Sequence, residues 1–355
     1  MADTKIYSDE FLDRKRLSGD KPADDFIKYI FADPVKKVQL QKWMNLTSGE
    51  KASDSLSTIF PGFKFIDEAQ QLPSWADPRL MKQGSAFFTR HSEIIMSLLG
   101  LLSLPYCYTA AQGTMVLYIS ELIRKQTTKR LYDTAIFVWD VMAPDAFDPN
   151  GNAYRQILKV RIMHASVRYY TYQSRKWHDD WGVPINQEDM AGTNLSFSLI
   201  VLRGLRLLGF NTSESDQEAF LHTWAVIGYL TGLDEDLISE NQKIGDELDD
   251  TIKRRQFCAS PHGQELTESL IAHILAVNKS KATDDDILGL MRYLLGTEIS
   301  DLLAIKNVKL PLYKLTLIRT FNLFKSFIPQ RNVDQKFQNA YTTFKKQSLE
   351  IMESM

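Results

Sequence analysis

An apolar segment that carries two arginines and a histidine is the part of this sequence best suited to chemistry. Arg161, His164 and Arg168 are spaced at i, i+3 and i+7 within the run 157–168, so they share one face of a helix. The apolar content of the run predicts that this helix is buried. Buried guanidinium groups require anionic partners, and a histidine between them can bind a metal ion. This stripe of Arg161, His164 and Arg168 therefore predicts a metal-containing cofactor with anionic groups, or a core helix whose arginines pair with Asp or Glu from neighbouring elements.

Haem b meets both requirements, because it offers iron to His164 and two propionates to Arg161 and Arg168. Covalent attachment of the haem is excluded, since the sequence contains no Cys-x-x-Cys-His motif. A second pair, Arg130 and Thr134, lies four residues apart on one face of the preceding predicted helix. An arginine and a hydroxyl placed together can bind an anion or polarise dioxygen. Both patterns also occur in ordinary helical cores, so these residues alone leave a purely structural interpretation open.

Composition favours a helical protein and excludes several functional classes. Only 17 glycines and 12 prolines occur in 355 residues, which predicts few turns and long helices. Because no strand-like alternation is convincing, the expected fold class is all-α. Lys and Arg number 42 against 44 Asp and Glu, so the net charge is −2 and does not indicate a protein that binds nucleic acid. The sequence has no Gly-rich dinucleotide motif, Walker loop or His-Glu-x-x-His zinc motif.

The sequence also predicts a cytoplasmic protein without a transmembrane segment. Its two cysteines, Cys107 and Cys258, lie far apart in the chain, which suits a reducing compartment. The first residues lack the basic region and apolar run of a secretory signal. The best membrane candidate, 94–105, is about a dozen residues long, whereas a spanning helix needs roughly 20.

Segments with helical hydrophobic periodicity, separated by short helix-breaking segments, predict one large domain over residues 1–355. We expect residues 1–75 to wrap a core as short helices, residues 85–300 to form that core, and residues 301–355 to add C-terminal helices. The aromatic tail 321–327 is expected to pack its apolar side on the core, with a partner contact as the alternative. Core helices are expected at 85–102, 110–126, 127–142, 153–178, 186–209 and 212–232.

Several motifs together resemble a known family. The spacing Arg130-x-x-x-Thr134 and the run Val160–Arg168 resemble the catalytic domain of latex-clearing proteins, the rubber oxygenases. The same family includes fungal oxygenases that cleave a prenyl side chain in mycophenolic acid biosynthesis. The resemblance covers roughly residues 85 to 300, and its order and spacing are specific for the family but not for a substrate. It continues through Trp181–Met190, Phe197-Ser198, Gly204–Gly209 and Trp224–Gly232.

This resemblance implies an α-helical, globin-like core that holds non-covalent haem b. His164 would be the proximal iron ligand, and Arg161 and Arg168 would hold propionates or fix the helix. Arg130 and Thr134 would be catalytic residues close to the dioxygen side of the haem. The implied partners are dioxygen and a small apolar substrate, while the oligomeric state is not predicted.

Two positions depart from the family pattern. Latex-clearing proteins can carry a lysine just before the motif threonine, where this sequence has Asp133. They also use an upstream glutamate as a candidate base for an allylic proton, and by spacing that position is Thr114 here. Glu121 is a poor substitute for such a base.

Three functions follow from the sequence. The first is a haem b-dependent oxygenase that adds dioxygen across, or cleaves, a carbon–carbon double bond of an apolar, isoprenoid-like substrate. The second is a non-catalytic haem-binding protein, such as a haem or gas sensor or a carrier, which the missing base favours. The third is a helical interaction protein without a cofactor, in which Arg161 and Arg168 form buried ion pairs.

Overall fold

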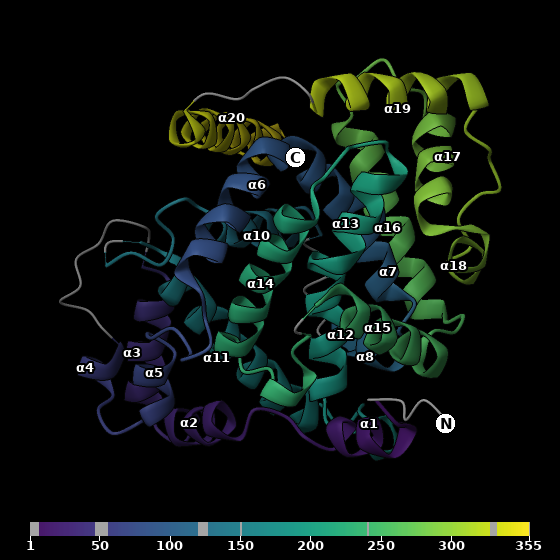
Figure 1. Cartoon of the computed structure of the whole chain (residues 1–355). Helices are drawn as coiled ribbons and strands as arrows, with labels where there is room; N and C mark the ends of the chain where they lie inside the picture. The colour runs from purple at the N-terminus through teal and green to yellow at the C-terminus, as the bar shows by residue number, and fades with distance from the viewer. Residues whose placement is uncertain are drawn as a thin grey trace, which may run out of the picture.

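Helices form all the named elements in the part of the chain that the structure describes (Figure 1). This structure is a computed structural model that describes residues 7–46, 56–119, 127–149, 151–239, 241–326 and 332–354. The all-α fold class predicted from the sequence is therefore confirmed.

The helices have the following bounds. The first half of the chain contains α1 (Asp9–Arg16), α2 (Lys21–Phe31), α3 (Pro34–Met44), α4 (Leu56–Ile59), α5 (Lys64–Glu68), α6 (Pro78–Leu98), the π-helix η2 (Leu99–Ser103), α7 (Leu104–Tyr108), α8 (Ala111–Ile119), α10 (Thr127–Val141) and α11 (Ala153–Gln173). The second half contains the short 3-10 helix η3 (Asp179–Trp181), α12 (Gln187–Phe197), α13 (Leu199–Leu207), α14 (Glu214–Leu230), the 3-10 helix η4 (Glu235–Leu237), α15 (Gln242–Gln256), α16 (Pro261–Val277), α17 (Asp284–Leu295), α18 (Thr297–Leu302), α19 (Leu312–Ser326) and α20 (Val333–Ser354).

Helix α6 packs along α14 and begins earlier than the sequence indicated. Asp77 caps it by accepting a hydrogen bond from the backbone N–H of Arg79, and Pro78 occupies its first turn. Ser85, the first residue of the helix expected over 85–102, lies inside the helix, where its hydroxyl donates to the Met142 carbonyl at 2.9 Å. A Cβ at Gly84 would lie 2.5 Å from the Ala219 carbonyl oxygen, so this close helix crossing requires glycine.

The chain continues as helix beyond residue 102, where the helix expected over 85–102 would end. The π-helical turn η2 follows α6 directly, and α7 follows η2 with Pro105 in its first turn. Proline is tolerated in a first turn, because the backbone N–H groups there have no partner within the helix. This continuation carries the chain inward to Cys107 and Tyr108, at the end of α7.

Helix α11 lies between two hydrophobic clusters. Its residues Ala153 and Ile157 belong to the main cluster, which includes residues of α6, α12, α13 and α14. Leu158, Ile162 and Ala165 belong to a second cluster formed with α2, α3, α4 and α5. Helices α2, α8, α10 and α14 all contact α11. The sequence prediction of a buried central helix over the stripe is therefore confirmed, although it ends at Gln173 and not near 178.

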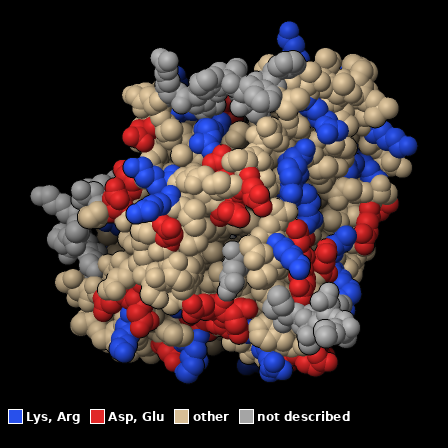
Figure 2. Space-filling model, viewed as in Figure 1, with Lys and Arg blue, Asp and Glu red and all other residues tan. Residues whose placement is uncertain are grey.

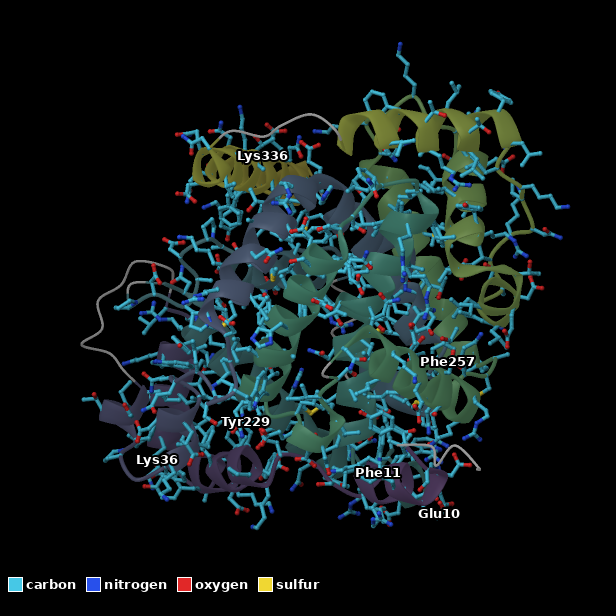
Figure 3. All side chains as sticks on the ribbon, in the orientation of Figure 1. Glu10, Phe11, Lys36, Tyr229, Phe257 and Lys336 are labelled. Atoms are coloured by element: carbon cyan, nitrogen blue, oxygen red, sulfur yellow. The ribbon has the colours of Figure 1, made fainter. Side chains whose placement is uncertain are left out.

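The C-terminal helices lie on the outside of the molecule, at the top of Figure 1. Helix α20 is fixed by a hydrogen bond of 2.7 Å from the Tyr341 hydroxyl to Asp140, and by Lys336, labelled in Figure 3, which donates to the Arg90 carbonyl. Helix α19 borders α13 and α17 at the upper right. None of the helices within the described ranges is long and apolar enough to cross a membrane.

Candidate functional site

Arg161 is tied to the N-terminal segment by a paired hydrogen bond. Its Nε and Nη2 donate to the two carboxylate oxygens of Asp20 at 2.6 and 3.0 Å. Asp20 is buried at the N-cap of α2, where it also accepts from the backbone N–H of Ala23. The guanidinium lies over the ring of Phe65, 5.3 Å from its centroid. These contacts satisfy the charge of Arg161 with a carboxylate from the chain itself.

Arg168 makes the second link between α11 and α2. Its Nε donates to Asp24 at 2.6 Å and its Nη1 to the Ile185 carbonyl at 3.2 Å, while the side chain is buried. Burial raises the pKa of Asp24, and the charge of Arg168 opposes that shift. The remaining Nη2 atom is buried without a hydrogen-bond partner among the described residues.

Asp20, Asp24, Arg161 and Arg168 together form what we call the α2–α11 ion-pair cluster. The sequence pattern left open whether the two arginines meet a cofactor or carboxylates of the protein, and in the structure both meet aspartates of the chain. The sequence analysis missed those aspartates. Their spacing of four residues was an available signal, because it places both on the face of α2 that meets α11.

A glycine and a glutamine support the ion-pair cluster from α12 and the end of α14. Gly232 has φ +100°, and a Cβ there would clash with the Asp20 carboxylate and lie 3.0 Å from Arg161 Nε. Gln187 donates to the Gly19 and Gly232 carbonyls at 2.9 Å each. Only glycine combines this backbone conformation with so close an approach.

His164 lies between the two arginines in sequence but does not join their ion pairs. Burial, together with the charges of Arg168 and Arg130, lowers the pKa of His164 to about 4, so the imidazole is neutral at pH 7. Its Nδ1 is buried and has no hydrogen-bond partner among the described residues. The ring nevertheless keeps part of its surface accessible. A deep, neutral imidazole with a free lone pair can serve as a metal ligand.

Arg130 on α10 is a partly buried cation without a carboxylate partner in the described part of the chain. Burial lowers the pKa of its guanidinium, while Tyr108 and Cys107 of α7 are close enough to act in the opposite direction. Arg130 also acts electrostatically on His164. Like His164, it keeps some accessible surface. An isolated buried charge is unfavourable unless something neutralises it, so this position can receive an anion.

Thr134 follows Arg130 by one turn and is half-buried. The adjacent Asp133 is exposed and forms an ion pair of 2.8 Å with Lys129 on the outer face of α10. The residue at the family lysine position is therefore exposed and already paired within α10. We call His164 and Arg130, which interact electrostatically, together with Thr134 one turn along the helix of Arg130, the α10–α11 interior site.

The residues near the expected base position are already engaged. Thr114 is buried on α8 and its hydroxyl donates to the Cys107 carbonyl at 3.1 Å. The Cys107 thiol faces Ser196 and Thr193 of α12, and burial raises its pKa to about 11. Glu121 lies outside the described residues. Sequence reasoning missed the proximity of Cys107 to Arg130, because nothing in the sequence indicates that α7 reaches α10.

A buried acidic residue organises the family-like run Trp181–Met190. Glu188 accepts from Arg16 at 3.2 Å and from Arg255 at 2.8 Å, which joins α12 to α1 and α15. Asn186 caps α12 by accepting from the backbone N–H of Asp189. In this run, two of the family-like residues therefore hold helices together.

His222, just before the family-like stretch Trp224–Gly232, has a structural contact. His222 Nε2 accepts from the backbone N–H of Asp77 at 2.8 Å, at the start of α6, and its ring packs edge-on against Trp75. Within the described ranges, no group of three or more His, Cys, Asp or Glu side chains is arranged to hold a metal ion.

Comparison with known proteins places the chain in a family. The sequence model of the ER-bound oxygenase mpaB/B'/Rubber oxygenase catalytic domain matches residues 90–321. The rubber oxygenase of Streptomyces sp. (strain K30) is 27% identical over 245 residues, which are 68% of this chain and 60% of that protein. The match thus spans about three-fifths of the length of that relative.

A solved structure shows the same fold. The latex clearing protein LCP in the closed state aligns with a TM-score of 0.75 at 22% sequence identity, over 92% of this chain and 90% of that chain. At this identity the likeness concerns the fold alone. Since the family model covers well over half of the sequence, the chain belongs to the family of the ER-bound oxygenase mpaB/B' and rubber oxygenase catalytic domains.

Proposed function

We propose that this chain is a haem b-dependent oxygenase that acts on a carbon–carbon double bond of an apolar, isoprenoid-like substrate. The observation that carries the proposal is the α10–α11 interior site, where a neutral imidazole lies near a partly buried arginine, and where neither His164 Nδ1 nor the arginine has a partner among the described residues. Haem b fits this pair, because it brings the other iron ligands itself and carries propionates that need a cation. We propose residues 85–300 as the haem-binding core.

The residues have distinct roles in this proposal. His164 is the iron ligand, and Arg161 and Arg168 fix α11 to α2 so that the imidazole keeps its orientation. Arg130 supplies a positive charge where little solvent screens it. Thr134 supplies a hydroxyl donor one turn away on the same helix. When bound, haem iron supplies the redox chemistry with dioxygen.

Membership of an oxygenase family supports the substrate class. The rubber oxygenase relative is named for a polyisoprene substrate, and apolar side chains of α10, among them Leu131 and Phe137, are packed beside the main core but remain partly accessible. Cleavage of an alkene by dioxygen places one oxygen atom on each alkene carbon and yields two carbonyl groups. This stoichiometry requires no further reductant.

Haem binding without catalysis is the second candidate function. The observation that favours it is that the position of the family base holds Thr114 and no carboxylate, and that the Thr114 hydroxyl is engaged with the Cys107 carbonyl. A haem or gas sensor, or a carrier, requires the iron ligand and Arg130 but no such base.

Substrate-dependent dioxygen consumption separates the two candidates. We would load the protein with hemin, reduce it, and measure dioxygen uptake and carbonyl products with squalene and with a short polyisoprene. An oxygenase consumes dioxygen and forms carbonyl products, and Thr134→Val lowers that rate while Thr342→Val, at an exposed position of α20, does not. Haem binding without any substrate-dependent uptake would instead support the sensor or carrier.

A further inference from the structure

Helix α19 exposes a broad apolar face on the outside of the molecule. Its residues Leu312, Tyr313, Leu317, Phe321 and Leu323 are between 44% and 80% exposed. At 100° per residue they occupy one side of the helix, with Thr316 and Thr320 between them. Large apolar side chains gathered on one exposed face mark an interaction surface, unlike apolar side chains scattered singly. The expectation that 321–327 packs on the core is wrong for Phe321 and Leu323.

The opposite side of α19 anchors it to the body of the protein. Ile318 packs against the main hydrophobic cluster, and Asn322 donates to the Leu208 carbonyl at 3.0 Å. Lys314 forms an ion pair of 2.7 Å with Asp286 of α17. The apolar face is therefore held outward by contacts on the inner side, and side chains of α19 project away from the body at the upper right of Figure 3.

The sequence along α19 carries charge of one sign, although two of its lysines, Lys306 and Lys314, pair with Asp285 and Asp286 of α17. Between Asp301 and Asp334 the sequence contains no acidic residue. It contains six basic residues in the same stretch: Lys306, Lys309, Lys314, Arg319, Lys325 and Arg331. Figure 2 shows an uncharged surface over α19, with Lys and Arg side chains beside it and no acidic side chain upon it. This pattern contrasts with the whole chain, whose net charge is −2.

We propose that α19 docks this protein on an anionic phospholipid surface. An exposed apolar helix face with basic residues at its edges is the composition of helices that lie in the membrane interface. Lys309 and Arg319 are exposed, and none of the described carboxylates pairs with them. They can therefore meet lipid phosphates, while Leu317 and Phe321 enter the acyl boundary.

Charge also argues against a second copy of the chain as the occupant. A two-fold symmetric contact would bring each face against itself and place basic edges opposite basic edges, which is unfavourable. Membrane docking goes beyond the proposed oxygenase function and does not depend on it, because none of the interior-site residues lies on α19.

Vesicle flotation of the full-length protein tests the apolar part of the proposal. We expect the protein to float with vesicles of phosphatidylcholine and phosphatidylserine. Replacing Leu317 and Phe321 together by serine should weaken binding by about a hundredfold, given the area that each buries. The matched control, Leu349→Ser, alters a residue of α20 that is 57% exposed and should bind as the wild type does. Circular dichroism of each variant checks that it is folded.

A second pair of variants tests the charge. Replacing Lys309 and Arg319 together by glutamine should weaken partition of the protein onto the vesicles by about 30-fold, because each basic residue near an anionic surface contributes about fivefold. Lys346→Gln on α20 is the control. Flotation that does not depend on Leu317 and Phe321, or is equally strong with phosphatidylcholine alone, would overturn the proposal. The proposal would also be overturned if the protein does not float but self-associates, as measured by sedimentation, and the serine variant abolishes that self-association.

Discussion

Two polar clusters meet at α11 and differ in how their charges are satisfied. In the α2–α11 ion-pair cluster, Arg161 and Arg168 each have an aspartate partner at 2.6 Å. In the α10–α11 interior site, Arg130 has no described carboxylate partner and His164 Nδ1 has no hydrogen bond. Structural clusters satisfy their own charges, whereas a binding site leaves groups for a ligand to satisfy. The comparison therefore separates residues that hold α11 in place from residues available to a cofactor.

Removing Asp20 should have the largest effect on stability. Asp20→Ala leaves the Arg161 guanidinium without its carboxylate and removes the cap of α2, so we expect the free energy of unfolding of the haem-free protein to fall by about 4 kcal/mol. Urea unfolding measures this loss. If Arg161 served only a cofactor, the haem-free protein would instead keep nearly all its stability.

The pH dependence of stability tests the burial of His164. Its pKa is lowered from 6.5 to about 4 in the folded protein, so between these values the unfolded chain binds a proton that the folded chain does not. Stability therefore falls as the pH decreases from about 6.5 to about 4, and His164 accounts for about 3 kcal/mol of that fall.

The measurement compares urea unfolding of the wild type and His164→Gln, both haem-free, across this pH range. The variant should lose stability less steeply than the wild type. His178→Gln is the control, because His178 is exposed. Parallel curves for wild type and His164→Gln would contradict the burial of the imidazole.

Arg130→Met should change the stability of the haem-free protein in the opposite direction to Asp20→Ala. Replacing an unpaired buried cation with an apolar side chain of similar length removes a desolvation penalty, so we expect the haem-free protein to gain about 1–2 kcal/mol. The same change should weaken hemin binding, measured by absorbance titration. A loss of stability in the haem-free protein would show that Arg130 has a structural partner like those of Arg161 and Arg168.

Asp133→Lys should have the smallest effect. The Asp133–Lys129 pair is exposed, and such pairs contribute about 0.5 kcal/mol or less. Because residue 133 points outward, a lysine there should leave the spectrum of bound hemin unchanged. A new absorption maximum in the hemin complex would mean that position 133 reaches the cofactor and that the outward placement of this side of α10 is wrong.

Helix periodicity predicted most of the fold, and local exceptions account for the errors. The helix expected over 186–209 divides at Ser198, whose φ and ψ of −115° and −81° interrupt it. The helix expected to reach 178 ends at Gln173, close to Arg175 with φ 55°. Breaks of this kind depend on tertiary contacts, which override the propensity of a single sequence.

The site could be predicted only in part for a similar reason. The shared face of Arg161, His164 and Arg168 follows from spacing within one helix. Their partners do not, because Asp20 lies 141 residues from Arg161 and Asp24 lies 144 residues from Arg168. Only the folded chain shows which of two similar arginine patterns is already neutralised.

The visible absorption spectrum of the hemin-loaded protein, before and after reduction with dithionite, tests the central claim most directly. We expect a Soret band that shifts on reduction in the wild type and in His178→Ala, and that is lost in His164→Ala. Retention of hemin with an unchanged spectrum in a folded His164→Ala protein would contradict the assignment of His164. A wild-type protein that binds no added hemin would contradict the haem-dependent function as a whole.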